Sequence, residues 1–508
     1  MKKRCLISVY DKTGIAAFAK RLAALGWEII STGNTSKTLT EEGIDVVDVA
    51  EVTQFPEILN GRVKTLSPRI FGGILFRRED ETHRQTVDEH GIGPIDMVVN
   101  TLYPFSETVA NPDASEQDII EKIDIGGPSL IRAAAKNYRD VLIVTDPSQY
   151  DDVLAALEND AADHSFRERL AAAAFRTTAA YEQAISSWFN EKNGDLSAWY
   201  GRFVDGEQLR YGENPHQKGF IYRSADPDAG GFAGMIQHQG KQLSYNNYND
   251  AGFAIEAIKE FGDKPTALAV KHANPCAVAQ GGSLLEAYAK CEAADPESIF
   301  GGIVCVNETV DASLAGALVQ IFLEVVIAPS YDAEALGILS QKKNLRVLEI
   351  PDLNEPLSSE MRMQSIPGGL LLQEKDTELY DELKVVTKRQ PDAHEMKDLA
   401  FAWKVAKIIK SNGIVIAKDE ATLGIGVGEV NRFWAVRAAL ERADEDRRGG
   451  VCASDAFFPF SDSVQALAEA GITAVVQPGG SIKDQDSIDA ADRAGMAMLF
   501  TGMRHFRH

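Results

Sequence analysis

The chain of 508 residues is 44% hydrophobic and 25% charged, with a formal net charge of -23. This length predicts about three domain-sized units, and the composition, without an apolar run long enough to span a bilayer, argues against a disordered chain and a membrane helix. Nucleic-acid binding is disfavoured because it usually needs a basic face, so an anionic ligand has to be held locally, by helix N-termini and single Arg or Lys residues.

The cysteines and the first residues point to a reducing compartment. Five cysteines are scattered and include no C-x-x-C pair, which argues against a disulfide framework and against a structural zinc site. The basic start and the short apolar stretch behind it are interrupted by Asp11 and Lys12 before a signal-peptide core could form. We therefore expect a cytoplasmic protein with free thiols and no required metal.

Predicted strands and helices alternate over about the first 145 residues. Strands are expected at residues 6–10, 28–31, 45–49, 97–99 and 141–144. Helices are expected at residues 15–25, from residue 35 to 42, at 115–123 and from Pro128 onward. This alternation predicts an α/β fold with a parallel sheet that is covered on both faces.

Polar loops follow several of these elements. Residues 32–35 join a strand to a helix N-terminus and would form an anion cradle, although many strand-to-helix turns look similar. Arg62 and Lys64 lie one residue apart in a stretch that could also be a solvated surface turn. Tyr103 follows the strand at 97–99 and can offer its hydroxyl to a ligand or merely pack.

A helical, Ala-rich pattern covers residues 149–190, and residues 194–206 are a plausible boundary between domains. Behind this boundary, the polar run at 209–217 has the composition of a binding loop more than of a spacer.

The apolar run 267–270 predicts a buried strand that ends at Lys271 and His272, with the turn expected at residues 274–275. Ligands of open α/β sheets bind at strand ends, where an imidazole can accept a proton and an ammonium group can stabilise an oxyanion. The alternative is a strand that simply ends in a polar turn.

Two further stretches combine polar and apolar residues. Glu324 lies inside an apolar run, so we expect it to be buried with a partner or in a ligand pocket. Residues 453–462 combine aromatic and acidic side chains, which suits a heteroaromatic ligand or a plain core. Residues 267–306 and 414–477 each read as strand, loop, helix and strand, which indicates an internal duplication.

Taken together, the chain resembles the bifunctional family of purine biosynthesis that unites phosphoribosylaminoimidazolecarboxamide formyltransferase with IMP cyclohydrolase. The resemblance covers essentially the whole chain. It rests on long motifs in the family's order: G-R-V-K-T-L, L-Y-P-F, I-D-I-G-G, R-A-A-A-K-N, R-Y-G-E-N-P-H-Q, K-H-x-N-P-C, S-D-A-F-F-P-F and R-H-F-R-H.

For residues 1–195 the resemblance implies a methylglyoxal-synthase-like domain that closes the purine ring by dehydration, without a cofactor. It assigns Lys64, Tyr103, Asp124 and Lys136 to the reacting groups, as oxyanion stabilisers and proton shuttles. The residues that it assigns to substrate binding are Ser8, Lys12, Thr32, Gly33, Asn34, Thr35, Arg62, Thr65 and Gly126.

For residues 196–508 the resemblance implies a formyltransferase built from two cytidine-deaminase-like units, which lack the P-C-x-x-C zinc ligands. The formyl group would come from 10-formyltetrahydrofolate as cosubstrate. His272 would take the proton of the ribotide amine, and Lys271 would stabilise the tetrahedral oxyanion. The residues that it assigns to the substrate and folate sites are Arg210, Tyr211, Phe300, Glu324, Asn412, Arg432, Phe457, Phe460, Asp462, Arg504 and His508.

The resemblance also implies a homodimer with small-molecule substrates. Several positions depart from the family's usual residues, and most of them lie in the cyclohydrolase half: Tyr10, Asn34, Ser67, Phe71, Thr101, Ala277 and Ser463. Two alternatives therefore stand beside the bifunctional enzyme. One is a formyltransferase whose N-terminal half binds nucleotide without closing the ring, and the other is a regulatory nucleotide-binding protein, which the intact Lys271 and His272 pair argues against.

Overall fold

The computed structural model describes residues 2–225, 230–262, 264–356 and 361–508. These residues form two compact units, Met1–Gly201 and Arg202–His508. None of the helices described is long and apolar enough to cross a membrane.

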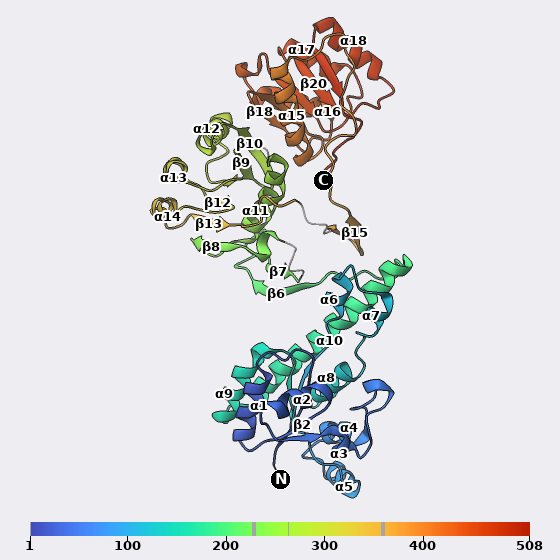
Figure 1. The fold of residues 1–508 in the computed structure, drawn as a ribbon. Coiled ribbons are helices and arrows are strands. Elements are labelled where there is room, and N and C mark those ends of the chain that lie inside the picture. Colours follow the sequence, from blue (N-terminus) through green and yellow to red (C-terminus); the bar gives the residue numbers. More distant parts are fainter. Residues whose placement is uncertain (1, 226–229, 263, 357–360) are drawn as a thin grey trace. The chain divides into compact units, whose positions relative to one another are not determined.

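The first unit is built on a five-stranded sheet in the order β3-β2-β1-β4-β5, in which every pairing is parallel (Figure 1). Its strands are β1 (Arg4–Val9), β2 (Glu28–Ser31), β3 (Val46–Asp48), β4 (Met97–Thr101) and β5 (Leu142–Val144). All five predicted strands are therefore confirmed. The apolar runs of β1, β2, β4 and β5 are buried because helices cover both faces of the sheet, as in other parallel sheets, whereas the edge strand β3 is half-buried.

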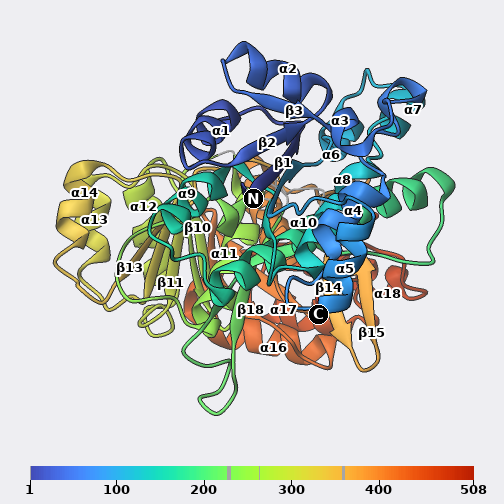
Figure 2. The ribbon, with the colours of Figure 1, turned by 90° about the horizontal axis from the view of Figure 1, so that it is seen from below.

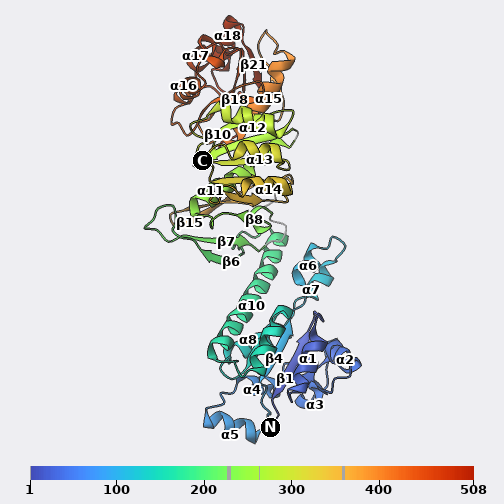
Figure 3. The same cartoon turned by 90° about the vertical axis from the view of Figure 1, so that its left-hand side faces the viewer.

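Five helical stretches of this unit were predicted, whereas the helices Val49–Thr53, Pro68–Leu75, Glu81–Glu89 and Phe105–Ala110 were not. The helices of the unit are α1 (Ile15–Ala24), α2 (Gly33–Glu41), α3 (Val49–Thr53), α4 (Pro68–Leu75), α5 (Glu81–Glu89), α6 (Phe105–Ala110), α7 (Glu116–Ile120), α8 (Gly126–Lys136), α9 (Tyr150–Glu158) and α10 (His164–Asn193). Figure 2 shows α1 and α2 beside the β1, β2 and β3 side of the sheet, and Figure 3 shows the long helix α10.

Three details of the helices differ from the prediction. α8 begins at Gly126, two residues before Pro128, because Asp124 accepts the N–H of Gly127 and starts the helix earlier. The helical stretch predicted at 149–190 is two helices, and Asp163 caps the second of them. The predicted helix at 115–123 is shorter than expected, although its capping box is present.

The second unit is built on a twelve-stranded sheet in the order β16-β21-β20-β19-β17-β18-β10-β9-β11-β12-β13-β8. Its strands are β8 (Ile236–Gln239), β9 (Thr266–Lys271), β10 (Asn274–Gln280), β11 (Ile303–Val306), β12 (Val325–Ala328), β13 (Arg346–Glu349), β16 (Lys384–Val385), β17 (Ile414–Lys418), β18 (Ala421–Gly426), β19 (Val451–Ser454), β20 (Ala474–Gln477) and β21 (Ala497–Phe500). Two separate ribbons are β6 (Phe203–Gln208) with β7 (Phe220–Ser224) and β14 (Arg362–Ile366) with β15 (Gly369–Gln373).

The strand order confirms the predicted duplication. From the centre outward, β10, β9, β11, β12, β13 and β8 repeat the pattern of β18, β17, β19, β20, β21 and β16, and β10 and β18 join the halves by antiparallel pairing. The predicted loop behind the first strand of each block is itself a strand, so each half opens with a hairpin.

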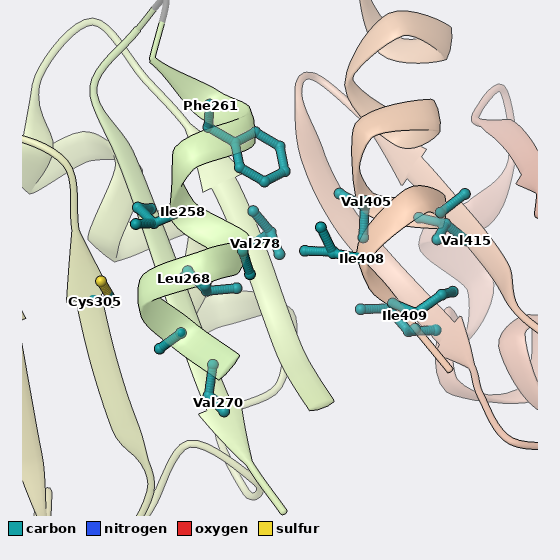
Figure 4. Packing of buried hydrophobic residues seen from close by; sticks show 14 of the residues in the cluster. Ile258, Phe261, Leu268, Val270, Val278, Cys305, Val405, Ile408, Ile409 and Val415 are labelled. Carbon is teal, nitrogen blue, oxygen red and sulfur yellow. The ribbon is translucent and has the colours of Figure 1, made fainter. Parts of the chain in front are cut away.

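Helices cover the two faces of this sheet differently. The helices are α11 (Tyr245–Ile258), α12 (Leu284–Ala294), α13 (Ala312–Leu318), α14 (Ala333–Leu339), α15 (Ala393–Ile408), α16 (Arg432–Arg442), α17 (Asp462–Glu469) and α18 (Asp484–Ala494). On one face, α11 and α15 contribute to one core that runs through both halves (Figure 4). On the other face, α12 to α14 pack on the first half (Figure 3) and α16 to α18 on the second.

Strand β18 approaches helix α16 so closely that its glycines have no room for a side chain. A Cβ at Gly424 would overlap the carbonyl oxygen of Ala439 and lie 2.7 Å from the backbone nitrogen of Ala443. The contact therefore depends on glycine at this position.

We expect Gly424→Ala to lower the free energy of unfolding by about 1–3 kcal/mol, because overpacking forces the backbone to shift. Gly316→Ala is the matched control. The Cβ at Gly316, on α13, meets nothing within 4 Å, so this change should raise stability by about 0.5–1 kcal/mol. Urea unfolding of the full chain measures both variants, and equal midpoints for the two would contradict the close approach of β18 and α16.

Candidate active sites

A cavity of about 710 Å³ lies in the first unit, at the carboxyl ends of β1, β2 and β4. β1 is the strand from which the order proceeds in both directions, to β2 and β3 on one side and to β4 and β5 on the other. Such a switch point opens a crevice that binds ligands in open α/β sheets.

Most residues predicted for the first half lie at this cavity. The predicted residues that line it are Ser8, Lys12, Thr32, Gly33, Asn34, Thr35, Arg62, Lys64, Thr65, Tyr103, Asp124 and Gly126. Lys136 is not among the described lining residues. It is exposed at the C-terminal end of α8, and Gly126 at the other end of that helix lines the cavity.

One side of the cavity is suited to an anion. The N-terminus of α2 faces the cavity, and its N-cap Thr32 leaves the helix without a side-chain cap. Gly33 has a left-handed φ of 57°, and a Cβ there would lie 3.5 Å from the Nζ atom of Lys64. Unpaired N–H groups at a helix end together with a nearby ammonium group bind negative charge well.

Lys12 completes this side. Its Nζ atom donates to Val9 O and, at 2.9 Å, to the hydroxyl of Thr35. Burial lowers the pKa of Lys12, and the charge of Lys64 lowers it further, against the opposing effect of Asp11. An anion bound beside Lys12 would favour the charged form of this ammonium group.

The cavity is also lined by a carboxyl group and a phenol. Oδ1 of Asp124 accepts the N–H of Gly127 at 2.8 Å, and the N–H of Asp124 donates to the hydroxyl of Tyr181 at 2.9 Å. Burial raises the pKa of Asp124, while the hydrogen bond from Gly127 and the charge of Lys64 lower it by less. Burial also raises the pKa of Tyr103, as do the charges of Asp124 and Glu57.

Sequence reasoning missed several lining residues. Asn100 is buried at the end of β4, donates to Ser8 O at 2.7 Å, and has an Oδ1 atom without a partner among the described residues. Asn100 directly follows the predicted strand 97–99, and a polar residue at a strand end was the signal that could have identified it. Glu57 also lines the cavity. Gly127 is missed as well, and it approaches Asn100 and Asp124 so closely that a Cβ would overlap Asp124.

The five positions of the first half that depart from the family pattern divide into two groups. Tyr10, Asn34 and Thr101 line the cavity. The hydroxyl of Thr101 accepts the N–H groups of Tyr10 and Asp11 at 2.8 and 3.1 Å and so fixes that loop. In contrast, Ser67 caps α4, and Phe71 packs against the core of the unit.

In the second unit, His272 lies in a tight turn between β9 and β10. The prediction of the turn at residues 274–275 was wrong, since Asn274 already pairs with Lys271 and the turn consists of His272 and Ala273. Both have left-handed φ values, 55° and 51°, which is the geometry of a type I′ hairpin turn. Oδ1 of Asp250, on α11, accepts the N–H of Ala273 at 2.8 Å. Sequence reasoning missed Asp250.

Lys271 points to the neighbouring loop. Its Nζ atom donates to the carbonyl oxygens of Ser298 and Phe300 at 3.3 and 3.0 Å. The ring of Phe300 is exposed, and its centroid lies 5.5 Å from that of the exposed Phe322. An ammonium group has three N–H donors, so these two bonds leave one donor for a ligand beside an aromatic surface.

Glu324 was predicted to be buried, and this prediction was wrong. The residue precedes β12, and its side chain is 44% exposed. Its Oε2 atom accepts from Nδ2 of the buried Asn247 at 2.8 Å, and Arg346 lies 3.9 Å away. The partner that the sequence argument required therefore exists, at the rim of the sheet.

The remaining residues predicted for the second half form separate clusters. Arg432 is buried and donates to Asp455, to Asn412 Oδ1 at 2.8 Å and to Gly413 O at 3.2 Å. Phe457 and Phe460 are exposed, whereas Phe458 is buried in the core. Asp462 is the first residue of α17. Arg210 stacks on Tyr211, Arg504 stacks on Phe506, and the carbonyl oxygen of His508 accepts from Arg362.

The described residues include no group of three or more His, Cys, Asp or Glu side chains that could hold a metal ion.

Comparisons with known proteins identify the family. A family model for the AICARFT/IMPCHase bienzyme matches residues 134–442, and a model for the MGS-like domain matches residues 14–129. The chain is 50% identical over 513 residues to the bifunctional purine biosynthesis protein PurH of Bacillus cereus (strain B4264), with all of both chains covered. It is 51% identical over 515 residues, with the same coverage, to the protein of that name from Caldicellulosiruptor bescii.

A solved structure described as the crystal structure of ForH is 35% identical and covers 39% of this chain and 100% of its own, at a TM-score of 0.35 that carries no argument. The full-length identity and the match of the bienzyme model to more than half of the chain agree with each other. The chain therefore belongs to the AICARFT/IMPCHase bienzyme family, whose members combine formyltransferase and cyclohydrolase activities in one polypeptide.

Proposed function

We propose that the cavity of the first unit closes the purine ring and that the turn of His272 in the second unit transfers the formyl group. The family membership makes the chain a bifunctional enzyme of the last two steps of purine biosynthesis. The observation that carries the assignment is the cavity that gathers Lys12, Lys64, Tyr103 and Asp124 at the sheet's switch point. A ribotide phosphate fits its cationic side, since α2 begins there.

Ring closure joins the carboxamide nitrogen to the formyl carbon. A C–N bond forms as the formyl C=O bond opens. The carboxamide nitrogen and the formylated nitrogen each lose one proton to the formyl oxygen, which leaves as water as the C–O bond breaks and a ring C=N bond forms. Lys64 stabilises the oxyanion that develops on the formyl oxygen, while Asp124 and Tyr103 transfer protons between nitrogen and oxygen. The pKa of Asp124 is raised by burial, which suits a carboxyl group that must both accept and return a proton.

Formyl transfer needs a base for a weakly nucleophilic amine and a stabiliser for the tetrahedral oxyanion. The exposed His272 accepts the amine proton as the nitrogen attacks the formyl carbon of 10-formyltetrahydrofolate. Lys271 stabilises the oxyanion with its remaining N–H and then protonates the folate nitrogen as the C–N bond to the folate breaks. The exposed rings of Phe300 and Phe322 offer an aromatic surface to the ligands.

The same proposal includes a homodimer in the cytoplasm. The ribbon of β14 and β15 exposes the apolar side chains of Met363, Ile366, Leu370 and Leu371, a surface of the kind that protein partners cover. The cysteines are free, which suits a reducing compartment. The donor groups at both sites are cations, a phenol, carboxyl groups and an imidazole, and the proposed steps need no metal.

We expect Lys64→Ala to lower the rate of cyclisation of supplied formyl-ribotide by about 100-fold or more, because it removes an oxyanion stabiliser. Formyl transfer should stay unchanged. Lys37→Ala is the control, since Lys37 is an exposed lysine of α2. Unchanged cyclisation in Lys64→Ala would contradict the role of Lys64, and absent cyclisation in the unaltered enzyme would favour the formyltransferase with an inactive N-terminal half.

His272→Ala should lower formyl transfer by about 100-fold to 10,000-fold, the usual contribution of a general base. The assay mixes the protein with aminoimidazole carboxamide ribotide and 10-formyltetrahydrofolate and separates the products by chromatography. Cyclisation of supplied formyl-ribotide by the same preparation is the internal control and should not change. An equal loss of both activities would argue against two separate sites.

Asp124→Asn should make the protein more stable than the unaltered chain at pH 7. Burial raises the pKa of Asp124 in the folded state, so the folded state binds more protons than the unfolded state, and stability falls as pH rises from the ordinary carboxyl range through the folded pKa. Asparagine cannot ionise and still accepts the N–H of Gly127. Its advantage in thermal unfolding should vanish near about pH 4; an advantage independent of pH would refute this cause.

A further inference from the structure

The turn that carries His272 has a second copy in the chain. The hairpin of β17 and β18 also turns through two left-handed residues, Asp419 and Glu420, both at φ 55°. His272 and Ala273 occupy the corresponding places between β9 and β10. Left-handed backbone is unfavourable for residues with a Cβ, and glycine, asparagine or aspartate is usual in such turns. Of the four turn residues only Asp419 is of this kind, so both turns gain from support outside the hairpin.

The lysines before the two turns make matching contacts. Lys271 Nζ donates to the carbonyl oxygen of Phe300 at 3.0 Å, and Lys418 Nζ donates to that of Arg448 at 3.0 Å. Phe300 lies three residues before β11 begins at Ile303, and Arg448 lies three residues before β19 begins at Val451. The correspondence of the copies therefore holds residue by residue.

A carboxylate supports each turn from the preceding helix. Asp250 accepts the N–H of Ala273 at 2.8 Å. Asp398 accepts the N–H groups of Asp419 and Glu420 at 3.0 and 2.7 Å. Both carboxylates lie six residues after the N-cap of a helix with a capping box, α11 in one half and α15 in the other.

We infer that Asp250 is a positioning residue for formyl transfer: its carboxylate holds the turn in the left-handed conformation that presents the imidazole of His272. This rests on the proposed role of His272. Asp250 and Asp398 both support the backbone of a turn, so this structural role is common to the two copies. Only the first turn carries an imidazole, so only Asp250 can also position a catalytic group. In the second turn, the side chain at the place of His272 is Asp419, which accepts from His394 Nε2 at 2.8 Å. The contact of Asp398 with the second turn is therefore a control for the contact of Asp250 with the first.

The test compares Asp250→Asn with Asp398→Asn in the full-length enzyme. Asparagine keeps the size of the side chain, but its neutral amide oxygen accepts an N–H more weakly than a carboxylate does. We expect Asp250→Asn to lower kcat for formyl transfer by about 100-fold, the usual effect of misplacing a catalytic group by an ångström, with KM for the ribotide little changed. Asp398→Asn should lose thermal stability and keep formyl transfer within about twofold, well below that 100-fold loss. Ring closure should be unchanged in both.

A second substitution separates positioning from folding. Glycine adopts left-handed backbone without strain, so Ala273→Gly added to Asp250→Asn should restore most of the lost kcat. The inference is overturned if Asp250→Asn transfers formyl groups normally, if Asp398→Asn loses as much, or if the folded double variant stays inactive. His272→Ala is assayed alongside. If His272→Ala retains activity, the proposed role of His272 fails. If His272→Ala is inactive and Asp250→Asn has a normal rate, only the inference about Asp250 fails.

Discussion

The two main sheets are buried on both faces, and this constraint decides where polar and reactive side chains can lie. Strands such as β9 and β17 are apolar over nearly their whole length because helices cover them on each side. Polar side chains are then confined to the points where strands end. Lys271 and Asn100 occupy such points in the two units. The same constraint explains why the residues at each site come from distant parts of the chain.

Much of the fold follows from this pattern and was predictable. Each strand of the first unit is an apolar run bounded by turn residues, and the repeated order of elements in the second half was visible in the sequence. The turn of His272 was predicted wrongly because Asn274 and Pro275 carry the local signature of a turn. The pairing of Asn274 with Lys271 across the hairpin outweighs that signature, and Asp250, distant in sequence, supports the less usual residues.

The sites were predictable where the chemistry is local. Residues 32–35 join a strand to a helix, and they lie at the cavity together with Lys64. Burial and long-range partners were not predictable in the same way. Arg432 was expected to bind a ligand, but its guanidinium group is buried against Asp455, which is 23 positions away in the sequence. Likewise, nothing local shows that the hydroxyl of Tyr181 supports the backbone at Asp124.

The antiparallel pairing of β10 with β18 has a consequence for the number of sites. Ala279 near the end of β10 lies opposite Ala421, which follows the second turn. Because β10 begins directly behind the first turn, its length of about 20 Å separates the two turns. They lie toward opposite ends of the sheet, too far apart to share one small ligand. The duplication therefore yields one imidazole-bearing turn per polypeptide, and the expected stoichiometry is one formyl-transfer centre for each chain.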